Sequence, residues 1–179
     1  MTEASVLRSD TAARQVFRWV PAAAALALVV FVTGSVGSMN SPADPRAVAM
    51  VELGRDAFNR GDKNAAIDAF EAALALDPGY NDAFIALADA TRARGLTAKS
   101  IDYYRSVLDR DPINFAALAG EGQALTEKGA IEKARRNLAV LNSMCGANCP
   151  ETIELKAAIV ADSTASLAAD NPGAGPASN

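Results

Sequence analysis

Apolar, small and turn-forming residues recur along this chain at an interval of 34 residues. Gly61, Gly95 and Gly129 stand one interval apart, and so do Pro78 and Pro112, each of which follows an aspartate. Within an interval, apolar residues recur at three- and four-residue spacing, which is typical of helices that bury one face. Three further sets keep the same register: Met50, Phe84 and Leu118; Phe70, Tyr104 and Leu138; and Ala66, Ser100 and Ala134. The pattern predicts tandem helical hairpins.

The glycines and prolines of this pattern mark the predicted helix ends. The recurring glycine ends the first helix of each hairpin, because a left-handed backbone costs little without a Cβ. The recurring proline follows the second helix, since proline lacks an N–H and clashes with the preceding turn. Small residues at Gly54, Ala88 and Gly122 predict a close approach between the two helices of a hairpin. Each hairpin leaves one apolar face uncovered, so neighbouring hairpins are expected to stack.

These positions resemble the tetratricopeptide repeat family. In residues 47–80 the matching positions are Leu53, Gly54, Ala57, Gly61, Ala66, Phe70, Ala73 and Pro78. Residues 81–114 keep Leu87, Ala88, Gly95, Tyr104 and Pro112. Residues 115–148 depart more, because Glu121 stands at a leucine position and Cys145-Gly146 replaces Asp-Pro. The resemblance implies an all-α fold, an α-solenoid of three helix-turn-helix repeats.

The repeat domain is predicted to span residues 47–162, closed by a capping helix over residues 150–162. The apolar residues of that helix alternate with polar ones and are Ile153, Leu155, Ile159 and Val160. Residues 163–179 show no periodicity and are rich in Ala, Ser, Asn, Pro and Gly, which predicts a disordered tail.

An uncharged apolar segment, residues 19–38, precedes the repeats. It follows a polar leader with three arginines, residues 1–18, and a proline-bearing linker, residues 39–46, comes after it. The segment reaches the lower end of the length that spans a bilayer as a helix. It is either a signal anchor, which the long leader favours, or a cleavable signal sequence. A buried helix of a soluble protein is the third interpretation.

Both export interpretations place the repeats outside the cytoplasm. The alanine-rich composition together with an export segment suggests a bacterial source. The expected location is the bacterial inner membrane, single-pass through residues 19–38, with the repeat domain in the periplasm. A periplasmic or secreted protein released by signal cleavage is the alternative.

Composition argues against catalysis and against nucleic acid as a partner. The chain has no histidine, so the commonest metal ligand and general base are missing. Its net charge is −4, with acidic and basic residues interspersed, and no basic stripe is present to bind nucleic acid. It contains no P-loop, GxSxG, dinucleotide or HExxH motif. We expect no enzyme activity, no cofactor, no metal and no small-molecule substrate.

The two cysteines, Cys145 and Cys149, bracket a three-residue turn before the capping helix. In an oxidising compartment a disulfide across this turn is the leading interpretation. A redox-active dithiol, metal capture and free structural thiols remain open. The spacing of three residues and the lack of a βαβ pattern count against the redox site.

The resemblance implies a concave groove, lined by the first helix of each repeat, that binds peptides or partner helices. The residues predicted to face it are Val51, Arg55, Phe58, Ile85, Asp89, Arg92, Ala119, Gln123 and Thr126. Relatives that capture C-terminal carboxylates use several cations there, whereas the matching positions here carry Val51, Arg55, Ala86, Ala116 and Gly120. We therefore expect a protein-binding adaptor that does not capture carboxylates. The alternatives are a thiol-dependent redox helper and a structural spacer.

Overall fold

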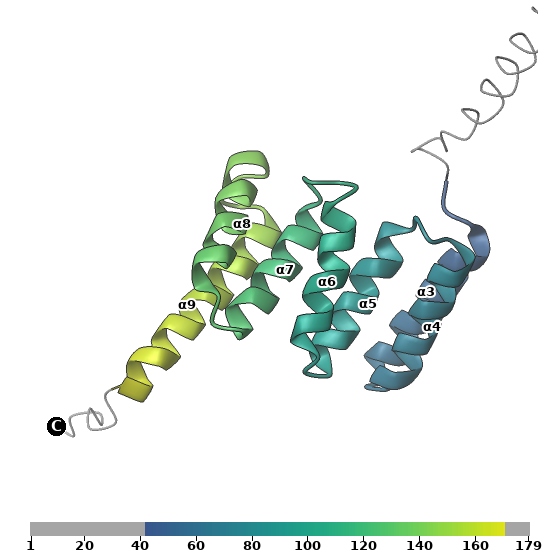
Figure 1. Ribbon diagram of the computed structural model, residues 1–179, viewed down its shortest axis with the longest axis horizontal. Coiled ribbons are helices and arrows are strands. Elements are labelled where there is room, and N and C mark those ends of the chain that lie inside the picture. The colour runs from purple at the N-terminus through teal and green to yellow at the C-terminus, as the bar shows by residue number, and fades with distance from the viewer. Residues whose placement is uncertain (1–41, 171–179) are drawn as a thin grey trace, which may run out of the picture. The chain divides into compact units, whose positions relative to one another are not determined.

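The computed structural model describes residues 42–170 as an array of helices, each packed antiparallel to the next (Figure 1). The helices are α3 (Pro45–Asn59), α4 (Lys63–Leu76), α5 (Asn81–Ala93), α6 (Thr97–Leu108), α7 (Phe115–Glu127), α8 (Ile131–Met144) and α9 (Pro150–Asp170). The predicted leader, the membrane segment and residues 39–41 of the linker lie outside these residues. Among the described helices, none has the length and hydrophobicity needed to cross a bilayer.

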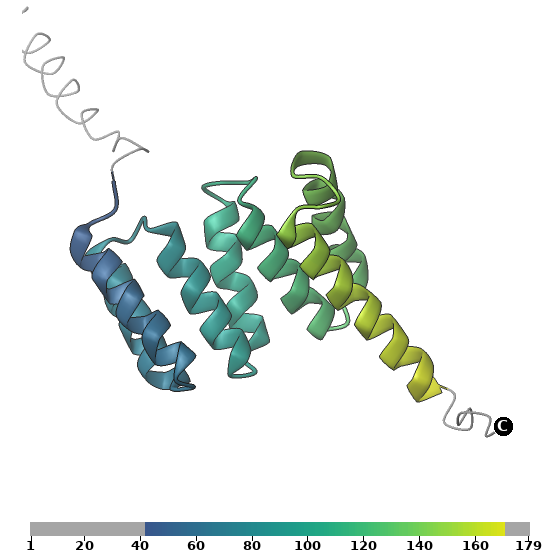
Figure 2. The ribbon, with the colours of Figure 1, turned by 180° about the vertical axis from the view of Figure 1, so that it is seen from behind.

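Three hairpins, α3–α4, α5–α6 and α7–α8, stack in chain order (Figure 2). The first helices also contact one another, α3 with α5 and α5 with α7, so they form one continuous face. Helix α9 packs against both α7 and α8 and covers the last hairpin. This arrangement confirms the predicted all-α solenoid with a C-terminal capping helix.

Local sequence explains where the helices begin and end. The side chains of Asp44, Asp62 and Asn114 cap α3, α4 and α7 by accepting hydrogen bonds from backbone N–H groups of the first turn. The recurring glycine after each first helix has a positive φ, for example 84° at Gly61, as predicted. Helix α4 ends at Leu76, just before the Asp-Pro pair.

The interior divides into two apolar clusters. One joins α3, α4 and α5 around Phe70, and the other runs from α5 to α9 around Tyr104. Phe70 is 1% exposed and Tyr104 is fully buried. Most of the remaining core is alanine, which lets the helices pack closely.

Small residues act as predicted in the first hairpin but not in the third. A Cβ on Gly54 would strike the ring of Phe70, so this glycine sets the approach of α3 to α4. A Cβ on Gly122 would instead strike Leu155 of α9, so this glycine admits the capping helix rather than its own partner α8. Gly120 makes room in the same way for Tyr104 of the preceding hairpin.

The capping helix is longer than predicted. Helix α9 continues from Asp162 to Asp170, into the segment that was predicted to be a disordered tail. The reason is that this stretch, STASLAAD, contains good helix formers and the first proline comes only at Pro172. The stretch lacks the apolar periodicity that predicts a buried face, but its residues still favour a helix. Residues 171–179 lie outside the described part of the chain.

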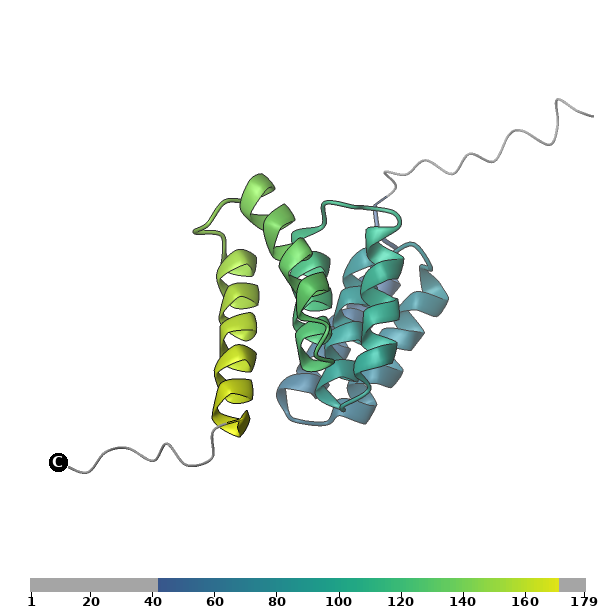
Figure 3. The ribbon, with the colours of Figure 1, turned by 60° about the vertical axis from the view of Figure 1, so that its left-hand side comes forward.

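Figure 3 shows the turn between α8 and α9. Both cysteines belong to this turn. Cys145 and Cys149 form a disulfide, as expected, with their Cα atoms 5.7 Å apart. The bond fixes the point at which the chain leaves the third hairpin and begins the capping helix. Because the closed loop is short, its effect on chain entropy is small, and its role is to hold this turn.

Candidate functional site

A groove runs along the face formed by α3, α5 and α7. Its deeper part, with a volume of about 340 Å³, is lined by Arg55, Phe58 and Asn59 of α3, by Phe70 of α4, by four residues of α5, and by Ala116 of α7. A second hollow of about 340 Å³ continues from it through Phe58 and Asp89 to Arg92, Ala93 and Glu127. Because the two hollows share Phe58 and Asp89, we treat them as one groove.

Helix α5 forms the floor of the groove. Asp82, Ile85, Ala86 and Asp89 are spaced i, i+3, i+4 and i+7, which places them on one side of the helix. The two carboxylates stand at the ends of this stripe, and the isoleucine and alanine lie between them. The floor is therefore apolar in the middle and acidic at both ends.

Five of the residues predicted to face the groove line it: Arg55, Phe58, Ile85, Asp89 and Arg92. Val51, predicted with them, is fully buried in the core cluster of α3, α4 and α5. Val51 lies on the same side of α3 as Ala47, Gly54 and Ala57, which are all buried, so it faces the core rather than the groove.

The prediction for α7 was also wrong. Ala119 and Thr126 are buried, and the Thr126 hydroxyl donates to the backbone carbonyl of Gly122 at 2.9 Å. Gln123 is half-buried and lies outside the groove lining. The open face of α7 instead carries Ala116 and Glu127, eleven residues apart and hence on one side of the helix.

The groove residues that were missed could have been found from helical spacing. Extending the predicted α5 stripe back by one turn from Ile85 and Asp89 gives Asp82 and Ala86. Glu127 follows Gln123 by four residues and was passed over in favour of its neighbour Thr126. Which of two adjacent residues of α7 faces the groove depends on how α9 packs on α7. The periodicity of α7 alone gives no information about that packing.

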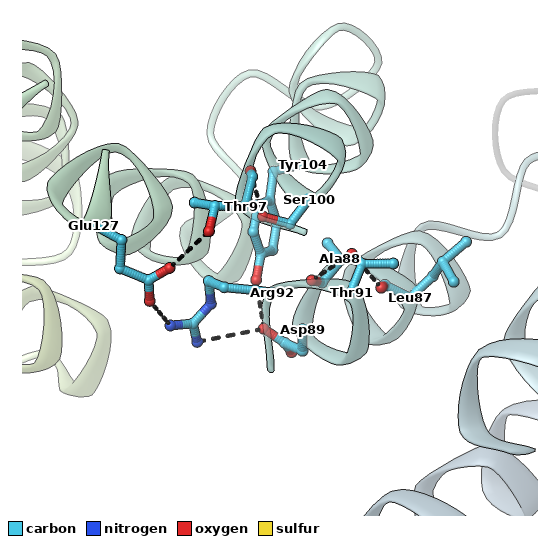
Figure 4. A network of polar contacts seen from close by, with 9 residues as sticks. All are labelled: Leu87, Ala88, Asp89, Thr91, Arg92, Thr97, Ser100, Tyr104 and Glu127. Carbon is cyan, nitrogen blue, oxygen red and sulfur yellow. Dashed lines mark hydrogen bonds and ion pairs between the residues drawn. The ribbon is translucent and has the colours of Figure 1, made fainter. Parts of the chain in front are cut away.

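A polar network crosses one end of the groove (Figure 4). The Tyr104 hydroxyl donates to Asp89 Oδ1 at 2.5 Å, and Arg92 donates to Glu127 Oε1 at 2.9 Å. Arg92 also stands 4.0 Å from Asp89 Oδ1, and the Thr97 hydroxyl donates to Glu127 Oε2 at 3.4 Å. The network ties α5, α6 and α7 together beneath the groove.

Burial in this network changes the acidity of its members. The groove walls partly desolvate Asp89 and raise its pKa, an effect that the hydrogen bond from Tyr104 and the nearby Arg92 reduce without cancelling. The Asp89 side chain still has 47% of its surface exposed. Burial and the adjacent Asp89 carboxylate raise the pKa of Tyr104 well above its usual value, so its hydroxyl stays protonated and donates.

A buried carboxylate explains why the third repeat departs from the family pattern at Glu121. Glu121, which stands where leucine was expected, is 7% exposed. It accepts hydrogen bonds from Arg105 Nε at 2.8 Å and from Asn137 Nδ2 at 2.8 Å. The glutamate thus joins α6, α7 and α8 through charge-assisted hydrogen bonds in place of an apolar contact.

The cysteine pair offers little for redox chemistry or metal binding. Glu151 lies within 4.8 Å of both sulfurs, but the sulfurs are bonded to each other and carry no thiolate charge to bind a metal. A carboxylate oxygen of Glu151 is 2.8 Å from the Cys149 sulfur, and a negative charge there disfavours the thiolate needed for exchange. The surroundings therefore fit a structural disulfide.

Comparison with known proteins gives a family match and structural likenesses. A family model described as tetratricopeptide repeat matches residues 51–112 and 85–139. No curated protein sequence matches the chain.

Two solved structures illustrate the likeness. The first TPR of Spaghetti (RPAP3) bound to the HSP90 peptide SRMEEVD has a TM-score of 0.59 and 20% identity, over 65% of this chain and 92% of that one. The Yersinia enterocolitica type III secretion translocator chaperone SycD has a TM-score of 0.58 and 21% identity, over 73% of this chain and 98% of that one. At these identities the likeness is one of fold.

Proposed function

We propose that the chain, whose residues 51–139 match the tetratricopeptide repeat family model, is an adaptor that binds a segment of another polypeptide in the groove along α3, α5 and α7. The observation that carries the proposal is the groove itself, with an apolar floor at Ile85 and Ala86 and polar groups at both ends. Such a surface suits a chain that offers side chains and backbone groups together.

The shape of the groove supports an extended peptide as the ligand. It continues past Phe58 from the deeper hollow to Arg92 and Glu127, and is longer than one side chain needs. The similar fold whose structure holds an HSP90 peptide is a precedent for peptide binding on this scaffold. The absence of histidine from the chain favours binding over catalysis.

The test is selection of peptides from a displayed random library on the full chain. Ala116→Trp places an indole in the groove at an exposed position of α7, and Ala139→Trp makes the same change on an exposed site of α8 away from it. We expect selected peptides to lose binding to Ala116→Trp and to keep it with Ala139→Trp. Equal binding to both variants would show that recognition does not use the groove, and would refute the proposal.

We further propose that residues 19–38 export the repeat domain and hold it at the inner membrane. The uncharged length of that segment and the arginines before it support this, and the Cys145–Cys149 disulfide is the kind of bond that an oxidising compartment maintains. A reporter enzyme that needs disulfides, fused after Asn179, is expected to be active. Leu28→Arg with Val30→Arg should abolish that activity. A reporter that is inactive with the natural segment would contradict export.

A further inference from the structure

The cations in the groove are already paired with carboxylates of the chain itself. Arg55 donates to Glu52 at 2.7 Å, and Arg92 donates to Glu127 at 2.9 Å with only 26% of its side chain exposed. Each arginine therefore brings its own counter-charge to the groove. Neither is left to attract an acidic ligand strongly.

The two carboxylates of the floor are not balanced in this way. Among residues 42–170, no lysine or arginine forms an ion pair with Asp82, and the nearest cation to Asp89 is Arg92 at 4.0 Å. Asp82 is exposed, and Asp89 keeps 47% of its side-chain surface open to solvent. The negative charge facing a ligand is therefore concentrated at the two ends of the α5 stripe.

The spacing of these carboxylates sets a length. Asp82 and Asp89 are seven residues apart on one helix, which corresponds to about 10 Å along its axis. A peptide in the extended polyproline II conformation covers that distance in about three residues and brings its side chains back to the same side at every third position. Between the carboxylates, Ile85 and Ala86 lie opposite Phe58, so the middle of the same stretch offers apolar contact.

From these observations we propose that the groove selects cationic extended segments, in which two Lys or Arg residues about three positions apart flank an aliphatic side chain. Each cation meets one end of the floor, Asp82 or Asp89, and the aliphatic side chain rests on Ile85 and Ala86. The inference rests on the proposed peptide-binding function and names its ligand class. It assigns this groove the opposite charge preference from one that captures an acidic C-terminus.

The test uses three nine-residue peptides on the full 179-residue chain. They share the sequence Gly-Ser-Ala-X-Leu-Ala-X-Ser-Gly, with Lys, Gln or Glu at both X positions, and Kd is measured by fluorescence anisotropy. We expect the Lys peptide to bind tighter than the Gln peptide by up to about five-fold for each charge, the upper range for an exposed ion pair. The Glu peptide should bind more weakly than both, and added salt should shrink these differences.

Paired variants assign the preference to the floor. Asp82→Asn with Asp89→Asn removes both charges but keeps an oxygen that accepts the hydrogen bond from Tyr104. This double variant should bind the Lys and Gln peptides with equal Kd. Asp68→Asn with Asp102→Asn makes the same change at exposed sites outside the groove and should leave the preference intact. Equal Kd values on the natural chain, a preference that survives the first pair, or no binding of the Lys peptide would each overturn the inference.

Two other outcomes separate this inference from the proposed function. If library peptides depend on the groove, as judged by Ala116→Trp, but show no cationic preference, the function stands and the inference fails. If the Lys peptide binds tighter once Arg8, Arg14 and Arg18 are changed to Gln, the chain's own leader is the occupant and the proposed partner segment is wrong.

Discussion

At the scale of single residues, Gly54 sets the distance between the first two helices. Three ring carbons of Phe70 lie within 2.9 Å of where a Cβ on residue 54 would stand, and Phe70 is 1% exposed. An added methyl group in such a well-packed place forces side chains off their preferred rotamers. The smallest possible residue is therefore required here for packing rather than for backbone conformation.

We expect Gly54→Ala to lower the free energy of unfolding by about 1–3 kcal/mol, because it overpacks this contact. Urea denaturation followed by circular dichroism measures the change. Gly79→Ala is the matched control, since a Cβ there would meet only Asp77 Oδ1, at 3.5 Å. Equal losses for the two variants would contradict the role assigned to Gly54.

The raised pKa of Asp89 makes a prediction about pH. Tyr104 of α6, Arg92 of α5 and Glu154 of α9 all act on this carboxyl, and burial has the largest effect. A carboxyl that binds its proton more tightly in the folded state costs stability when ionised, and this cost disappears as pH falls through the folded pKa. We therefore expect Asp89→Asn to raise the free energy of unfolding at pH 7, by less than about 1 kcal/mol for a half-exposed group.

The advantage of Asp89→Asn should vanish below about pH 4, where the natural carboxyl is protonated in both states. Urea denaturation over a pH series measures this difference. Asp68→Asn, at an exposed site of α4, should show no such pH-dependent gain. A natural chain that is more stable than Asp89→Asn at pH 7 would contradict the direction of the pKa shift.

At the scale of elements, the capping helix packs through three buried side chains on one side, Thr152, Leu155 and Ile159. The Leu155 side chain is fully buried and fills the space left by Gly122 of α7. Ile153, two residues earlier on α9, is 53% exposed. Only one side of this long helix is therefore anchored to the repeats.

Leu155→Ala is expected to lower the free energy of unfolding by about 2–5 kcal/mol, as a large-to-small change in a closed core does. Ile153→Ala on the same helix should change it by no more than about 0.5 kcal/mol. Thermal or urea denaturation compares the pair. Similar losses from both would mean that α9 packs through a different face.

Sequence periodicity predicted the helices better than their contacts. The recurring glycines and prolines located the three hairpins because they act through backbone conformation, which depends on few neighbours. The partner of Gly122, the burial of Thr126 and the ion pair of Glu121 depend on residues from other helices. On α5, where the groove follows a simple helical stripe, the predicted residues line the groove; on α7, where α9 covers part of the face, two of the three predicted residues are buried.

At the scale of the described domain, residues 43–170, stability is shared between two clusters along the stack. Phe70 lies at the centre of the first cluster and Leu141 in the second, and both side chains are buried. In a solenoid each hairpin contacts only its neighbours, so damage in one place spreads by steps rather than at once.

We expect Phe70→Ala to remove hydrogen-exchange protection from α3 and α4 while α7 and α8 keep most of theirs. Leu141→Ala should give the reverse pattern, with α8 and α9 losing protection first. Hydrogen exchange read by mass spectrometry distinguishes the two. Uniform loss of protection along the domain in both variants would show that the array unfolds as a single unit.

The alanines of the groove have a consequence for how this protein could acquire new partners. Ala86 and Ala116 line the groove; Ala116 is exposed, and Ala86 is half-buried where it packs against the first apolar cluster. A change to a larger or charged side chain at either site would reshape the binding surface without opening a cavity. Substitutions at these two positions could therefore change which partner the adaptor binds while the packing of its helices changes little.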